Sequence, residues 1–220
     1  MRYKFYREHK YVSSALNNLE RLIAKADFRV AAEIEPITKE FAETMQMLMW
    51  HAKYENDSLH SLLKNKGSTV FKDIEHEHDH LDKAIQKLEG LLAAATNATE
   101  PEDQVECGYQ FYLWYRKFVG DNLVHLHDEE TIILPELQRL YNDEELRAVE
   151  FATYHQMSAD DMIEMLKVLF PHMNPADHVV LLQDLKDAEP AKFAVAWQTI
   201  KKVLPSAEQA ALVKQLGLAD

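Results

Sequence analysis

The sequence predicts an all-α protein, and three observations support this fold class. Glycine is scarce, with 5 residues among 220. No stretch alternates polar residues with β-branched apolar ones, as a half-buried strand does. Apolar residues instead recur at helical spacing in long stretches, and short segments rich in turn residues separate them. A chain of this length can bury one sizeable core and carry an appended subdomain.

Four predicted helices fill the first 140 residues. They cover about residues 3–25, 36–66, 68–95 and 99–134. Proline is favourable in a first helical turn and glycine after a last turn, so Pro36 and Pro101 indicate starts and Gly67 an end. Ser68 can cap the third helix, and Pro135 is expected to stop the fourth. We therefore expect an up-down-up-down four-helix bundle over residues 1–140.

A C-terminal helical extension is expected over residues 141–220. Asn142 and Glu145 have the spacing of a capping box, which predicts the start of a fifth helix. Shorter helices are expected at Ala176–Leu185, Pro190–Val203 and Ser206–Leu216, with Gly217 as a stop signal. We interpret this extension as a helical cap on or beside the bundle, or as a surface for a protein partner.

Composition excludes several classes of function. The formal net charge is −13, and no cluster of lysine and arginine is visible, which disfavours nucleic acid and anionic membranes as partners. The single cysteine, Cys107, rules out an intramolecular disulfide and a cysteine-based zinc or iron–sulfur site. The first residues form no apolar signal segment, and no run approaches the length of a membrane span. These features are typical of a cytoplasmic protein.

The pattern H-x-x-x-E occurs twice, as His51 with Glu55 and as His125 with Glu129. Within a helix each pair projects from one face, one turn apart. One such pair is more often a surface contact than a metal site. Two further histidines, His9 and His78, stand near the starts of helical stretches, so the chain holds two copies of one histidine followed by His-x-x-x-Glu.

An internal repeat supports this interpretation. The segment REHKYVSSALNNLERL aligns with HEHDHLDKAIQKLEGL, which superposes His9 on His78. In an up-down bundle, ligands at one depth lie equally far from the turn that joins their helices. The midpoints between successive ligand positions fall near residues 31, 65 and 102, where turn chemistry predicts the breaks. All six side chains are therefore expected in one layer.

Imidazole and carboxylate together form a ligand set that suits iron, manganese or zinc. A carboxylate from each half can bridge two cations and offset their mutual repulsion. We therefore predict a dinuclear metal centre formed by His9, His51, Glu55, His78, His125 and Glu129. Asp82 remains open as a seventh ligand or an outer hydrogen-bond acceptor, Glu130 as an alternative bridge, and His155 as a gate or extra ligand.

The other polar residues near these positions are given lesser roles. The glutamates that precede His9 and His78 point to another side of the helix, so they are expected at the surface or outside the ligand shell. His76, His80 and His127 lie two residues from a ligand and are expected to face solvent. His60, His172 and His178 are interpreted as ordinary surface or packing residues.

The arrangement resembles the hemerythrin-like (HHE cation-binding) family. The segments that carry the resemblance are REHKYVSSALNNLERL, MLMWHAKYENDSLHSLL, IEHEHDHLDKAIQKLEGLL and NLVHLHDEETIILPEL. They cover about residues 1–140, and the H-L-x-x-E-E-x-x-x-L-P stretch from His125 to Pro135 is the most specific part.

The resemblance implies a four-helix bundle with two non-haem iron ions, Fe2+ or Fe3+, joined by an oxo or hydroxo bridge, with manganese or zinc as less favoured metals. It also implies the six ligands above, with both glutamates as bridges, and a small diatomic or peroxide ligand. Oxygen-carrying members have a fifth histidine one turn from another on the third helix. Ile74 and Asp82 occupy those positions here, which leaves a more open site and argues against simple oxygen carriage.

Four functions remain open from sequence. The first is a di-iron protein that binds or senses O2, NO or peroxide, and the second is a peroxidase-like or oxidase-like enzyme at the same site. The third is a helical interaction module whose metal is structural or of another kind. The fourth, a ferritin-like carboxylate protein, requires Glu-x-x-His on two helices, and that spacing occurs here only around Glu75–His80.

Overall fold

A computed structural model describes residues 2–218, and every regular element in this range is a helix. The chain divides into two compact units. The long-helix unit comprises Val12–Leu140, and the short-helix unit comprises the residues up to Tyr11 together with those from Tyr141 on. The all-α fold class is thereby confirmed. No helix in the described range is both long and apolar enough to cross a bilayer.

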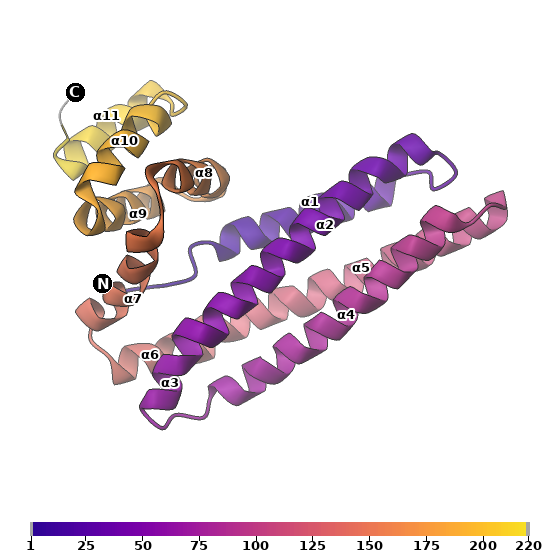
Figure 1. Ribbon diagram of the computed structural model, residues 1–220, viewed down its shortest axis with the longest axis horizontal. Helices are drawn as coiled ribbons and strands as arrows, with labels where there is room; N and C mark the ends of the chain where they lie inside the picture. The colour runs from indigo at the N-terminus through magenta and orange to yellow at the C-terminus, as the bar shows by residue number, and fades with distance from the viewer. Residues whose placement is uncertain (1, 219–220) are drawn as a thin grey trace. The chain divides into compact units, whose positions relative to one another are not determined.

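The long-helix unit contains four extended helical segments (Figure 1). The first is α1 (His9–Lys25), which enters the unit at Val12. The second joins α2 (Ala31–Tyr54), η1 (Glu55–Leu59) and α3 (His60–Asn65), the third is α4 (Phe71–Asn97), and the fourth joins α5 (Pro101–Asp128), η2 (Glu129–Ile133) and α6 (Leu134–Leu140). The segments η1 and η2 are single π-helical turns. Both interrupt a long α-helix, and neither was expected from the sequence.

Four predicted helix ends were wrong. The second helix begins at Ala31 rather than at Pro36, which lies inside α2 just after its first turn. The first helix begins at His9 rather than residue 3, because Tyr6 adopts a left-handed conformation (φ 68°) that interrupts a right-handed helix. Ser68 does not cap α4, since its hydroxyl donates to Glu136 Oε1 over 2.8 Å. Pro135 does not end the fourth segment, because it occupies the second position of α6, directly after the π turn, where its missing amide donor is tolerated.

Aromatic rings fill the core of the long-helix unit away from the histidines. The rings of Phe28 and Phe41 both pack edge-on against Phe111, at centroid separations of 6.3 and 5.8 Å. Gly108 faces this layer, and a Cβ atom there would stand 2.4 Å from the Phe28 ring, so only glycine fits. The buried Tyr115 hydroxyl donates to the carbonyl of Leu16, which ties α5 to α1.

The short-helix unit holds the C-terminal helices. They are α7 (Asp143–Gln156), α8 (Ala159–Leu169), η3 (Phe170–His172), α9 (Pro175–Ala188), α10 (Pro190–Ile200) and α11 (Ser206–Leu216). The predicted capping box at Asn142 is confirmed, because its side chain accepts from the Glu145 amide while the Glu145 carboxylate accepts from the Asn142 amide. Gly217 ends α11 in the left-handed conformation, as expected.

A buried polar cluster ties the N-terminal residues into the short-helix unit. The Tyr3 hydroxyl donates to Glu150 Oε2 over 2.6 Å and lies 3.1 Å from Asp184 Oδ2. Tyr154 donates to the same Glu150 oxygen over 2.9 Å. Arg147 pairs with Asp184 at 3.2 Å, and Arg7 lies 3.8 Å from Glu150. We call this set the Tyr/Arg cluster.

Candidate metal centre

Five of the six predicted ligands lie together in the long-helix unit. His51 is near the end of α2, His78 is in α4 and His125 is near the end of α5. Glu55 and Glu129 are the first residues of η1 and η2. The two glutamates are 1% and 0% exposed, although carboxylates rarely leave solvent without a compensating partner. Helical spacing thus turns both motifs toward one buried location.

The ring nitrogens and carboxylates lie just beyond hydrogen-bond distance. His51 Nε2 is 3.4 Å from Glu55 Oε1, and His125 Nε2 is 3.3 Å from Glu129 Oε1. His78 Nε2 lies 3.6 Å from Glu55 Oε2 and 3.8 Å from Glu129 Oε1. The Nε2 atoms of His78 and His125 are 3.0 Å apart. Three imidazoles therefore direct the same ring atom at the two carboxylates.

These side chains form two overlapping groups of potential metal ligands. In the first group, ligand atoms of His51, Glu55 and Glu129 lie within 4.8 Å of one another. In the second, the same limit joins Glu55, His78, His125 and Glu129. Both glutamates belong to both groups. A carboxylate has two oxygens and can bind one cation through each, so this overlap is what two neighbouring cations with shared carboxylates require.

The π turns put matching residues around each glutamate. Counting from the glutamate, positions 0, 4, 5 and 8 are buried in both halves. These positions are Glu55, Leu59, His60 and Leu63 in one half, and Glu129, Ile133, Leu134 and Leu137 in the other. A π turn brings residue 5 onto the side of residue 0, where an α-helix would not. The two halves of the internal repeat therefore match in backbone conformation, with a π turn at the same place, as well as in side chains.

Two polar side chains hold the outer nitrogens of the ligand rings. His125 Nδ1 donates to Glu77 Oε2 over 2.8 Å, because a carboxylate only accepts. His78 Nδ1 lies 3.2 Å from Asn56 Oδ1. Both contacts leave the Nε2 lone pair directed inward, the tautomer that a metal-binding imidazole needs. Glu77 was expected outside the ligand shell or at the surface; Asn56 was missed, since its position on η1 depends on the π turn.

His60 is also closer to the centre than its sequence position suggested. It is fully buried, and its ring stacks on that of His78 with centroids 5.9 Å apart. Burial lowers the pKa of His60 to about 4. The only sequence signal is that His60 stands five residues after Glu55, which places two residues on one side solely within a π turn.

The remaining candidates differ in burial and in their neighbours. Glu130 is exposed, whereas Glu129 faces inward. Asp82 is exposed and lines a cavity beside the histidines. His155 is exposed in the short-helix unit, where its Nδ1 lies 2.7 Å from Glu189 Oε1. His9 is the buried first residue of α1, and the centroid of its ring lies 4.4 Å from that of Tyr6. It belongs to the short-helix unit.

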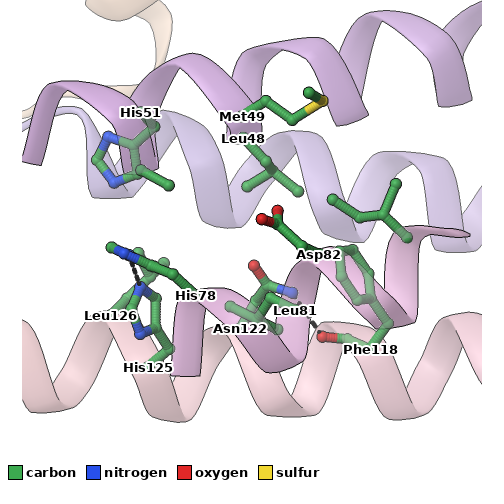
Figure 2. A pocket seen from close by; sticks show the side chains of 12 residues that line it. Leu48, Met49, His51, His78, Leu81, Asp82, Phe118, Asn122, His125 and Leu126 are labelled. Carbon is green, nitrogen blue, oxygen red and sulfur yellow. Dashed lines mark hydrogen bonds between the residues drawn. The ribbon is translucent and has the colours of Figure 1, made fainter. Parts of the chain in front are cut away.

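A small cavity opens beside the histidines (Figure 2). His51, His78 and His125 line one part, and apolar side chains such as Leu48 and Phe118 line most of the rest. It offers about 20 Å³ of room for the centre of a water-sized molecule, while one water needs roughly 10–15 Å³ on this measure. A ligand of one or two heavy atoms therefore fits next to the centre.

The donor set fits a metal ion. Neutral imidazole nitrogens and ionised carboxylates are ligands for borderline divalent cations such as iron, manganese and zinc. Two carboxylates with little exposure to water favour a bound cation, because burying negative charge alone is costly. The fold and site thus define an all-helical protein with a buried histidine–glutamate centre suited to cations.

Comparison with known families agrees with this class. The family described as "Hemerythrin HHE cation binding domain" matches residues 1–137. The chain therefore belongs to the hemerythrin HHE cation-binding domain family, which confirms the resemblance drawn from the sequence. No curated protein and no solved structure matched the chain.

Proposed function

We propose that this chain is a non-haem di-iron protein that binds, senses or reacts with O2, NO or peroxide. The observation that carries the proposal is the sharing of two buried glutamates by two groups of potential ligands. His51 completes one group, and His78 with His125 completes the other. Iron supplies one-electron redox chemistry and open coordination positions when bound at such a site.

Side chains around the proposed ligands orient the histidines and shape the cavity. Glu77 and Asn56 keep the rings of His125 and His78 oriented, so the histidines need little rearrangement to bind. The apolar wall of the cavity limits access by water and strengthens electrostatic interactions at the site. Its size suits a small molecule, as the proposed diatomic and peroxide ligands are.

We propose His9 as the sixth ligand, in the group of His51. His9 aligns with His78 in the internal repeat, so the two groups then have equal composition. It is buried, and its helix α1 continues without interruption into the long-helix unit. We further propose that residues 1–140 form an up-down-up-down bundle and that residues 141–220 form an extension that can bind a protein partner.

Iron loading tests the proposal. The protein loaded with Fe2+ should contain two irons per chain and show the charge-transfer absorption of a bridged diferric centre after oxidation. Glu129→Ala should retain less than one iron, because both groups lose a ligand, whereas His51→Ala should retain about one. Glu130→Ala, which alters the exposed neighbouring glutamate, is the matched control and should retain two.

The alternatives give different results. Less than one iron per chain with unchanged helicity would contradict the di-iron proposal. A Glu129→Ala variant that keeps two irons would instead overturn the assignment of Glu129 as a ligand. Tight binding of zinc or manganese in preference to iron would favour the reading of a structural or different metal. Dithionite, O2, NO and peroxide, added in turn, then separate reversible binding from turnover.

A further inference from the structure

The small cavity beside the histidines reaches the protein surface at two residues. Of the side chains that line it, only Met49 on α2 and Asp82 on α4 are exposed, and the others are buried or partly buried. Figure 2 shows both side chains. Met49 and Asp82 also line hollows on the protein surface. The opening of the cavity therefore lies within a larger surface depression.

Two surface hollows lie end to end along α2 and α4. Residues 38–50 of α2 and 89–97 of α4 contribute the lining of one hollow. Residues 49–57 of α2 and η1 and 72–82 of α4 contribute that of the other. Because Met49 lines both, we treat them as one groove and call it the α2/α4 groove. At 1.5 Å per residue, its α2 wall is about 28 Å long.

The α2 wall of the groove is apolar. Phe41 and Met45 are buried at its base, and Met49 continues the same row four residues further on, at the surface. Residues at this spacing form a ridge against which another helix can pack. Trp50 adds a ring that is 67% exposed, although tryptophan is highly buried on average. An exposed apolar surface of this kind is typical of a binding site for a protein partner.

The α4 wall of the groove is acidic. Asp79, Asp82 and Glu89 line it and are exposed, and helical spacing puts them toward one side of α4. None of the three forms an ion pair with another residue in the described part of the chain. A row of unpaired carboxylates beside an apolar wall is complementary to a segment that carries basic side chains next to an apolar stripe.

The other charged residues of the groove do not offset this acidity. Lys53 pairs with Asp57, and Glu75 pairs with a lysine outside the groove, so Lys72 alone stands against the three carboxylates. A second copy of the chain is a poor occupant, because its formal net charge of −13 repels an acidic wall. Charge therefore favours a basic partner.

From this arrangement we propose that the α2/α4 groove binds an amphipathic helix of a partner protein. The apolar side of that helix lies on the α2 wall, and its lysine or arginine residues lie on the α4 wall. A groove of this length accommodates a helix of about 18 residues. A helix bound there covers Met49 and Asp82, so it closes the cavity beside the histidines. Binding to the groove requires no iron, and this inference therefore stands apart from the proposed di-iron function.

Peptide binding to the full chain tests the inference. The probe is a peptide of about 18 leucine and lysine residues, with the leucines at helical spacing along one side. It should bind one to one in titration calorimetry, and more weakly as the salt concentration rises. The matching peptide with glutamate in place of lysine should not bind, because its charges repel the α4 wall.

Variants locate the binding surface. Trp50→Ala should weaken binding of the leucine–lysine peptide about thirtyfold, since a large aromatic contact near the middle of the groove is lost. Trp114→Ala removes a tryptophan of α5 that does not line the groove, and it is the matched control. Glu89→Lys should weaken binding about fivefold, because an attraction becomes a repulsion. Glu106→Lys changes the net charge equally at an exposed position of α5 and should leave the affinity unchanged.

Thiol labelling tests whether the bound helix closes the cavity. In Met49→Cys, the bound peptide should protect the introduced thiol from iodoacetamide. Cys107, which lines neither hollow, should react at an unchanged rate and is the internal reference. Labelling at position 49 that bound peptide does not slow would overturn the closure of the cavity.

Two results would overturn the docking site itself. Equal affinity for the lysine and glutamate peptides, or equal losses of affinity in Trp50→Ala and Trp114→Ala, would show that binding does not involve the groove. Concentration-dependent dimerisation of the chain that Trp50→Ala abolishes would show that a second copy occupies the groove.

Discussion

The chain buries two polar clusters, one in each unit, and the neighbours of their carboxylates differ. In the Tyr/Arg cluster, Glu150 and Asp184 lie beside the guanidinium groups of Arg7 and Arg147. In the candidate metal centre, Glu55 and Glu129 lie beside imidazole nitrogens. Arginine carries a permanent positive charge and cannot bind a metal, whereas neutral imidazole can.

Both clusters contain buried carboxylates, and the side chains beside these carboxylates decide whether a metal ion can bind. Arginine side chains lie beside the carboxylates of the Tyr/Arg cluster, and tyrosine hydroxyls donate hydrogen bonds to them. The histidine–glutamate centre has ligands that direct lone pairs inward, so an external cation completes it. We therefore expect the stability of the long-helix unit to depend on metal and that of the short-helix unit to depend on pH.

Metal removal should have the largest effect. A ligand present at a thousand times its dissociation constant stabilises the folded state by about 4 kcal/mol for each site. Chelation of iron should therefore lower the free energy of unfolding of the long-helix unit by at least about 4 kcal/mol. Denaturant unfolding followed by Trp114 fluorescence, in a variant with the other two tryptophans replaced by phenylalanine, measures this change.

Trp197 provides the matching measurement in the short-helix unit, where it is 3% exposed. A variant that retains only Trp197 should show a much smaller change on chelation. Equal losses of unfolding free energy at Trp114 and Trp197 would contradict the comparison, because metal would then stabilise both units alike.

The second prediction concerns Glu150 and pH. Burial raises the pKa of Glu150 to about 7, and burial also raises the pKa of Asp184. Between about pH 4.5 and pH 7 the folded state keeps the Glu150 proton that the unfolded state has lost, so stability falls as pH rises through this window. Glu150→Gln removes this dependence. Its stability relative to the parent should increase by roughly 3 kcal/mol between pH 4.5 and pH 8.

Unfolding followed by Trp197 at a series of pH values measures this difference. Glu164→Gln removes an exposed carboxylate of the same unit and serves as the control for the loss of one negative charge. A constant difference between Glu150→Gln and the parent across the series would show that Glu150 titrates normally.

Much of the fold could be predicted because its signals are local. The capping box at Asn142 and the stop at Gly217 each depend on side-chain types within a few residues. The two π turns could not be predicted in this way, since ENDSL and EETII share only their first glutamate. The change in hydrogen-bond register depends on which residues the neighbouring helices bury, and Pro135 was misjudged for the same reason.

The candidate site likewise contains residues that local spacing predicts and residues that depend on contacts between helices. His51, Glu55, His125 and Glu129 were found because helical spacing alone puts each pair on one face. Asn56 and Glu77 contact histidines on other helices, and Asn122 lines a cavity formed by several helices, so finding them requires the rotation of each helix about its axis. Sequence spacing therefore predicted the inner residues of the centre and not the side chains that orient them or line its cavity.

His60 allows the smallest and sharpest test of the comparison. It is a buried polar residue in the long-helix unit, and it lacks the hydrogen bonds seen in the Tyr/Arg cluster. Neither of its ring nitrogens has a hydrogen-bond partner among the described residues. The matching position in the other half of the repeat holds the buried Leu134. His60→Leu should therefore raise the free energy of unfolding by about 1 kcal/mol, since the desolvation of an unsatisfied polar group is removed.

Iron content should stay at two per chain in His60→Leu, because His60 belongs to neither ligand group. The reciprocal variant, Leu134→His, should lose stability by roughly 2 kcal/mol, since it buries a polar ring where packing is apolar. Both values follow from denaturant unfolding monitored by Trp114. If His60→Leu instead loses iron while its helicity is unchanged, the stacking of His60 on His78 orients that ligand, and the metal centre includes a residue that its repeat partner lacks.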